Sequence, residues 1–196
     1  MTLSNYLTLL RGTASLIFIP IVAIDDQLAR LFALLIFTLA AFSDYYDGRL
    51  ARLRNEKTTF GVIADPIADK FLTVICFVSL SLLRPEMVPF WMTVLIIARE
   101  LLITSWRFYA LSRGRVLAPD RWGKWKTGLQ MTAIPYALLV TALFSGDAGR
   151  ELEDAIRPLG FDTVLFGIGW MLSFIAVFIT IFSGFNYIAA ELKNRR

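Results

Sequence analysis

Four aspartates occupy one short stretch of the chain at regular intervals. Asp44 and Asp47 are three residues apart, and Asp65 and Asp69 are four residues apart. Residues three or four apart lie on the same face of a helix, so each pair would project its two carboxylates together. Both pairs lie beside or within apolar runs, where an unpaired carboxylate is costly. A ligand or counter-ion must therefore compensate this concentration of negative charge.

Repulsion among four converging carboxylates is too large for helix packing to absorb. Two like charges about 5 Å apart at an effective dielectric constant of about 20 repel each other by roughly 3 kcal/mol. Insertion near a bilayer adds up to roughly 2.5 to 3.5 kcal/mol for each carboxylate. Bound cations can offset both costs, and a ligand set of oxygens alone is typical of Mg²⁺ or Mn²⁺. A pair of such ions would suit phosphoryl transfer.

The rest of the composition narrows the possible chemistry. The 196 residues include no histidine and a single cysteine, Cys76, which excludes an imidazole base, a cysteine-rich zinc site and a disulfide framework. Hydrophobic residues make up 57% of the chain and charged residues 18%, which indicates an integral membrane protein. The formal net charge of +4 does not indicate nucleic-acid binding, because the basic residues cluster beside apolar spans.

Small and basic residues lie between the two aspartate pairs. Gly48 and Ala51 keep one helix surface slim enough for a base or sugar to approach, and Gly61 opens the facing helix. Arg52 offers a forked donor to phosphate, although it could instead be a simple anchor at the membrane surface. Together with the aspartates, this pattern predicts a binding slot for a nucleotide diphosphate.

A second group of candidate residues is cationic. Arg99 lies inside an apolar helix, where an ionisable residue marks a candidate functional site. Arg107 lies two turns further on, about 80° round the same helix, and Lys124 and Lys126 lie at the start of the next span. These four residues are candidates for a pocket that binds a phosphate on an acceptor. Alternatively, Arg99 pairs with Glu100, and the lysines only orient their helix.

Six apolar runs must position these residues, and most of them reach the length of about 20 residues that a transmembrane helix needs. They cover residues 7–24, 31–51, 63–83, 89–111, 127–144 and 164–190. The first run is interrupted by Arg11 and Pro20, so we expect its N-terminal part to lie at the membrane interface. The runs predict an all-α, polytopic membrane protein with six transmembrane helices in a single domain over residues 1–196.

The distribution of lysine and arginine predicts how these helices are oriented. Basic residues cluster in the second-to-third connection, in the fourth-to-fifth connection and at the C-terminal tail, whereas the opposite connections hold few basic residues and several acids. Loops rich in lysine and arginine stay in the cytoplasm. We therefore expect both termini, and the active site around the aspartates, on the cytoplasmic side of the membrane.

The spacing of the aspartate stretch resembles the signature of the CDP-alcohol phosphatidyltransferase family. It reads Asp44-x2-Asp47-Gly48-x2-Ala51-Arg52-x8-Gly61-x3-Asp65-x3-Asp69. The resemblance implies six membrane helices, two divalent ions held by the four aspartates, and a CDP-linked lipid bound through its diphosphate. It also implies that Asp69 is the general base that deprotonates an acceptor hydroxyl, which attacks the lipid-side phosphorus so that CMP leaves.

Three further segments are similar to bacterial phosphatidylglycerophosphate synthases. These are IARELLITSWR from Ile97 to Arg107, GKWKTGLQM from Gly123 to Met131, and NYLTLLR from Asn5 to Arg11, which adds Thr8 and Arg11 to the candidate site residues. This similarity implies CDP-diacylglycerol and sn-glycerol 3-phosphate as substrates, a homodimer, and a location in the bacterial cytoplasmic (inner) membrane. It ends near Met131, and the last third of the chain looks generic.

Other functions stay open from the sequence. The same chemistry could use phosphatidylglycerol as acceptor, as in a cardiolipin synthase, or inositol phosphate. A divalent-cation transporter could also place aspartates in a membrane, but no acidic partner sites follow along a path to the other side. A non-catalytic scaffold would give no reason for a completed set of metal ligands.

Overall fold

A computed structural model describes the backbone of residues 3–54, 59–114 and 121–193, and the side chains of residues 12–43, 70–114 and 122–189. Within these ranges the regular elements are helical and no strand occurs. The prediction of an all-α protein is therefore confirmed.

Six long helices form the body of the molecule, and each covers one of the predicted apolar runs. They are α1 (Leu3–Ala23), α2 (Gln27–Arg54), α3 (Thr59–Leu83), α4 (Phe90–Ser112), α5 (Arg121–Leu143) and α7 (Phe161–Lys193). Between α5 and α7 lie the short helix α6 (Gly146–Ile156) and a 3₁₀ turn, η1 (Arg157–Leu159), which the apolar runs did not predict. The sequence analysis missed α6 because that helix is short and mostly polar.

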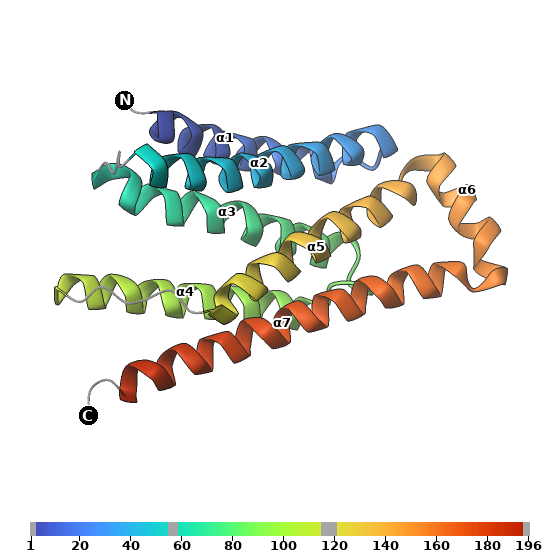
Figure 1. Ribbon diagram of the computed structural model, residues 1–196. Helices are drawn as coiled ribbons and strands as arrows, with labels where there is room; N and C mark the ends of the chain where they lie inside the picture. The colour runs from blue at the N-terminus through green and yellow to red at the C-terminus, as the bar shows by residue number, and fades with distance from the viewer. Residues whose placement is uncertain (1–2, 55–58, 115–120, 194–196) are drawn as a thin grey trace.

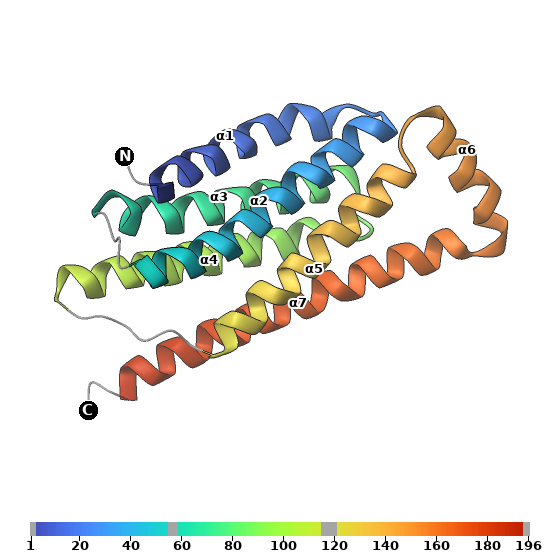
Figure 2. The same ribbon diagram turned by 45° about the horizontal axis from the view of Figure 1, so that its top comes forward.

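Consecutive long helices run in opposite directions, as Figures 1 and 2 show. The start of α1, the end of α2, the start of α3 and the end of α7 all lie at one end of the bundle, which we call the aspartate end. The opposite end carries α6, and we call it the α6 end. Within the bundle α1 packs against α2 and α3, α5 against α2 and α7, and α4 against α3 and α7.

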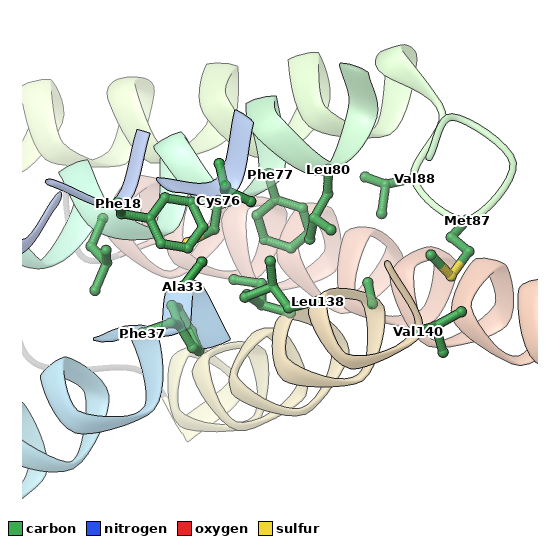
Figure 3. Packing of buried hydrophobic residues seen from close by; sticks show 14 of the residues in the cluster. Phe18, Ala33, Phe37, Cys76, Phe77, Leu80, Met87, Val88, Leu138 and Val140 are labelled. Atoms are coloured by element: carbon green, nitrogen blue, oxygen red, sulfur yellow. The ribbon is translucent and has the colours of Figure 1, made fainter. Parts of the chain in front are cut away.

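Apolar side chains from several helices fill the middle of the bundle. Figure 3 shows Phe18 of α1, Phe37 of α2, Phe77 and Leu80 of α3 and Leu138 of α5 gathered between the ribbons. All five side chains are almost completely buried. This packing fixes the rotation of each helix and hence the direction in which its polar side chains point.

The two residues that interrupt the first apolar run do not break the first helix, and the interfacial position of its N-terminal part stays a prediction. Helix α1 continues through both Arg11 and Pro20. A proline removes one backbone donor and crowds the preceding turn, but Pro20 lies in the last turn of α1 and Phe18 and Val22 anchor that turn in the core. Helix α5 likewise continues through Pro135.

One described segment, Phe161–Ala189, is long and apolar enough to cross a membrane on its own. Three shorter described segments are also apolar: Gly12–Ala23, Gln27–Ser43 and Lys70–Leu83. Large apolar side chains such as Leu82, Leu102 and Phe185 are exposed on the outside of the bundle, as at a surface that contacts lipid or another protein. The number of membrane spans stays a prediction.

Candidate active site

The four aspartates lie on the two helix segments that meet at the aspartate end. Asp44 and Asp47 lie in the last three turns of α2, and Asp65 and Asp69 lie in the first three turns of α3. Asp47 is seven residues before the end of α2 and Asp65 is six residues after the start of α3, so their backbones lie at similar distances from the connection. The backbone therefore has the helical form that the spacing argument requires.

The side chains of these aspartates lie outside the described residues, and their role as metal ligands stays a prediction. The same holds for the other candidates Gly48, Ala51, Arg52, Gly61, Thr8 and Arg11, which lie in α2, α3 and α1. Among the side chains that the structure does describe, no three acidic or cysteine residues form a group that could hold a metal ion. The donor chemistry of the aspartates fits Mg²⁺ or Mn²⁺, because all four donors are carboxylates.

A cluster of ionisable side chains surrounds Glu100 of α4, which is only 5% exposed. The ammonium of Lys126, from α5, donates to Glu100 Oε1 at 2.5 Å, and Arg99 Nη1 donates to the same oxygen at 3.1 Å. Lys70 Nζ, from α3, lies 3.7 Å from Glu100 Oε2. We call these four residues the Glu100 cluster. Three helices therefore converge on one buried carboxylate.

Among the described side chains, three cations contact the single carboxylate of Glu100. Lys126 is 8% exposed, so water screens it poorly. These cationic donors make the cluster suitable for an anion such as a phosphate. Lys70 directly follows Asp69 in α3, so such an anion would be held close to the aspartate end.

Arg99 is held by both of its terminal nitrogens. Nη1 contacts Glu100, and Nη2 donates to Ser183 Oγ of α7 at 2.9 Å. Its Nε is buried and has no hydrogen-bond partner among the described residues. The pairing of Arg99 with Glu100, which the sequence analysis gave as an alternative to phosphate binding, is confirmed. It does not exclude an anion site, since Arg99 Nε makes no hydrogen bond to the described residues.

The four predicted phosphate-binding residues do not form one group. Arg99 and Lys126 meet at Glu100, whereas Arg107 contacts Tyr187 of α7, with Nε 3.4 Å from its hydroxyl and the guanidinium 5.3 Å from its ring centre. Lys124 is exposed at the start of α5. Residues two apart on a helix point to different sides, which explains why Lys126 reaches the cluster while Lys124 points elsewhere.

The sequence analysis missed three members of this site. Glu100 appeared only as a partner of Arg99, Lys70 was overlooked beside Asp69, and Thr104, whose hydroxyl accepts a hydrogen bond from Lys70, was not considered. A usable signal was present, because Glu100 and Thr104 are four residues apart on a helix that also carries Arg99. A polar face inside an apolar helix was therefore readable before the fold was known.

Comparison with known proteins places the chain among relatives with a shared chemistry. The family model of the CDP-alcohol phosphatidyltransferases matches residues 1–183. A CDP-diacylglycerol–glycerol-3-phosphate 3-phosphatidyltransferase of Rickettsia typhi is 36% identical over 189 residues, which cover 96% of each chain. The protein of the same name from Bacillus subtilis is 32% identical, over 81% of this chain and 72% of its own. A probable phosphatidylglycerophosphate synthase of Mycobacterium tuberculosis is 35% identical, over 98% and 82%.

Proposed function

The chain belongs to the CDP-alcohol phosphatidyltransferase family, and from this premise we propose that it transfers a phosphatidyl group from CDP-diacylglycerol to sn-glycerol 3-phosphate. The products are phosphatidylglycerophosphate and CMP. The observation that supports the choice of acceptor is the convergence of three cationic side chains on the buried carboxylate of Glu100, where they offer donors to a phosphate. The names of relatives at 32 to 36% identity point to the same acceptor.

The aspartate end would bind the nucleotide lipid. Asp44, Asp47, Asp65 and Asp69 would hold two Mg²⁺ or Mn²⁺ ions, which would neutralise negative charge on the diphosphate. Gly48, Ala51, Arg52 and Gly61 would leave room for the cytidine and contact the phosphates, with Thr8 and Arg11 nearby on α1. Asp69 would accept the proton of the acceptor hydroxyl while the hydroxyl oxygen forms a bond to the lipid-side phosphorus. The bond from that phosphorus to CMP breaks.

The Glu100 cluster would bind the phosphate of the acceptor. A phosphate monoester carries between about 1.5 and 2 negative charges near neutral pH, which the cationic donors of the cluster would stabilise. Arg99 and Lys126 would be the main donors, and Lys70 would connect this phosphate to the helix of Asp69. Arg107 and Lys124 lie further from Glu100, so they would act by steering an anion toward the site.

The protein would cross a bacterial cytoplasmic membrane six times, with both termini and the active site on the cytoplasmic side. The antiparallel order of six long helices, the basic residues at the aspartate end and the exposed apolar side chains support this arrangement. A homodimer would be the functional unit, as the resemblance to the family implies.

The test is an acceptor screen with the purified protein in detergent, CDP-diacylglycerol and Mg²⁺. Each acceptor is supplied alone: sn-glycerol 3-phosphate, glycerol, inositol phosphate or phosphatidylglycerol. We expect stoichiometric CMP release with sn-glycerol 3-phosphate and little with glycerol, which offers the same hydroxyls without the phosphate. Preference for phosphatidylglycerol or inositol phosphate would replace the proposed acceptor. Metal flux into liposomes without any CMP release would instead favour a transporter.

A further inference from the structure

Helix α7 has one polar face in the part of the chain that the sequence analysis treated as generic. Thr180, Ser183, Gly184 and Tyr187 follow the i, i+3, i+4, i+7 spacing of a single helix face. All four residues are buried, although α7 is otherwise strongly apolar. Because α7 packs against both α4 and α5, this face is placed to contact the helices that carry the proposed phosphate ligands.

Two neighbouring residues of this face contact Arg99. Ser183, with no exposed surface, accepts the hydrogen bond from Arg99 Nη2 at 2.9 Å. Gly184 leaves room for the rest of the arginine, since a Cβ at this position would lie 3.3 Å from Arg99 Cγ and 3.5 Å from Arg99 Nε. A larger residue at position 184 would force the arginine to shift. The pair therefore sets both the path and the direction of the Arg99 side chain.

The same face continues toward Arg107. Tyr187 is 7% exposed, and its ring lies beneath the Arg107 guanidinium, which adds a cation–π contact to the long hydrogen bond with the hydroxyl. Ser183 and Tyr187 are one turn apart on α7, and Arg99 and Arg107 are two turns apart on α4. One helix face thus holds both arginines.

A third contact connects the same face of α7 to α5. Gln130 Nε2 donates to Thr180 Oγ1 at 3.2 Å, and both side chains are buried. Gln130 lies four residues after Lys126, so the two side chains share one face of α5. The rotation that directs Lys126 to Glu100 is therefore also the rotation that pairs Gln130 with α7.

We propose that this face of α7 positions the cations of α4 and α5 for the acceptor phosphate, with Ser183 and Gly184 as the positioning residues for Arg99. The inference rests on the proposed function, because it assigns these residues to the phosphate end of that reaction. Neither residue needs to touch substrate. If the face served only to pack helices, its loss would lower stability and affect both substrates alike.

Ser183→Ala tests the hydrogen bond to Arg99. We expect the KM for sn-glycerol 3-phosphate to rise about tenfold, because a hydrogen bond to a charged group is lost. The KM for CDP-diacylglycerol should stay within about twofold of wild type, and the thermal midpoint should stay within a few degrees. Ser173→Ala is the matched control. Ser173 is a serine of the same helix, 1% exposed, whose hydroxyl has no partner among the described residues.

Gly184→Ala tests the close approach independently, with Gly167→Ala as its control because a Cβ at Gly167 meets nothing within 4 Å. We expect Gly184→Ala to raise the KM for sn-glycerol 3-phosphate several-fold and Gly167→Ala to leave it unchanged. An unchanged KM in both test variants, equal changes for both substrates, or unfolding of both test variants would overturn the inference. A wild-type protein that does not use sn-glycerol 3-phosphate would overturn the proposed function itself, so the two failures are distinguishable.

Discussion

Two groups of charged residues in this bundle are built in opposite ways. At the α6 end, Arg84 Nη1 lies 3.4 Å from Glu153 Oε2 and Nη2 donates to the carbonyl of Phe144 at 2.9 Å. Arg30, which is 6% exposed, pairs with Asp25 at 3.2 Å and donates to Ser145 Oγ at 2.5 Å. The Glu100 cluster, by contrast, surrounds a single carboxylate with three cations.

The two groups differ in how their charges are paired. Each arginine at the α6 end has at least one carboxylate partner, and the described ion pairs there join four arginines to six acids: Arg30, Arg84, Arg150 and Arg157 with Asp25, Glu86, Asp147, Glu153, Asp154 and Asp162. These pairs tie loops and helix ends together, which is a structural role. The Glu100 cluster instead gathers three cations around one buried carboxylate inside the bundle, which agrees with the proposed phosphate site.

The largest expected effect concerns the aspartate end. Asp69→Asn removes the proposed base while keeping the size of the side chain. We expect CMP release to fall by about 10²- to 10⁴-fold, the range typical of a lost general base, with an unchanged thermal midpoint. The measurement is CMP formation with saturating substrates and Mg²⁺. Asp154→Asn, at an exposed acid of the α6 end, serves as the control, and equal rates for the two variants would contradict the role of Asp69.

Glu100→Gln tests the Glu100 cluster directly, because it removes the carboxylate that three cations contact. Removal of one partner from a buried pair costs about 3 to 5 kcal/mol of stability, so we expect a markedly lower thermal midpoint. We also expect inorganic phosphate to restore more of that midpoint in the variant than in wild type, since a bound anion replaces the missing charge. Glu86→Gln at the α6 end, where Arg84 keeps Glu153, should show neither effect. Equal phosphate responses in both variants would contradict an anion site.

Removal of one arginine from each group compares the two groups directly, with Arg99→Ala in the Glu100 cluster and Arg84→Ala at the α6 end. Loss of Arg99 should raise the KM for sn-glycerol 3-phosphate by about 10- to 100-fold, the equivalent of one lost charge-assisted contact, and leave the KM for CDP-diacylglycerol nearly unchanged. Loss of Arg84 should lower the thermal midpoint, because its contacts to Glu153 and to the rings of Phe144 and Phe166 disappear, and leave both KM values unchanged. A higher KM for sn-glycerol 3-phosphate in Arg84→Ala, with only a lower thermal midpoint in Arg99→Ala, would contradict the assignment of binding to the Glu100 cluster.

The sequence predicted the six long helices but not the short helix α6. Six apolar runs became six helices because long apolar periodicity is a strong local signal. Helix α1 stays regular at Pro20, where the tertiary packing of Phe18 and Val22 outweighs the local effect of the proline. Helix α6 was missed because a search for apolar runs cannot detect a short polar helix that caps the bundle.

The candidate site was predictable where chemistry is local and not where it depends on packing. An arginine inside an apolar helix signals a site by itself, and Arg99 was found in this way. The choice between Lys124 and Lys126 depends on the rotation of α5, which the core fixes, so the sequence alone treated the two lysines as equal. The contact of Ser183 with Arg99 joins residues 84 positions apart, and no local pattern reveals such a contact. The role of the aspartate side chains as metal ligands stays a prediction.

The smallest expected effect is at Asp25, an exposed acid in the turn between α1 and α2 at the α6 end. The backbone N–H of Gly146 contributes most to holding the pKa of this carboxyl below its usual value. Burial opposes this effect, and the side chains of Arg150 and Arg30 add to the lowering. A lowered pKa in the folded state stabilises the protein above the unfolded-state pKa of about 3.9, and this stabilisation disappears as the pH falls through the folded-state pKa.

Asp25→Asn should therefore lower the free energy of unfolding at pH 7 by no more than about 1 kcal/mol, as for other exposed ion pairs. The difference from wild type should shrink as the pH falls through the lowered pKa of the wild-type carboxyl, because that carboxyl then becomes protonated as well. Thermal midpoints of both proteins between pH 7 and pH 3 in one detergent measure this, and CMP release at pH 7 should be identical. A change in the KM for sn-glycerol 3-phosphate would show that the α6 end is coupled to the Glu100 cluster, and the division of the molecule into a structural and a binding group of charges would fail.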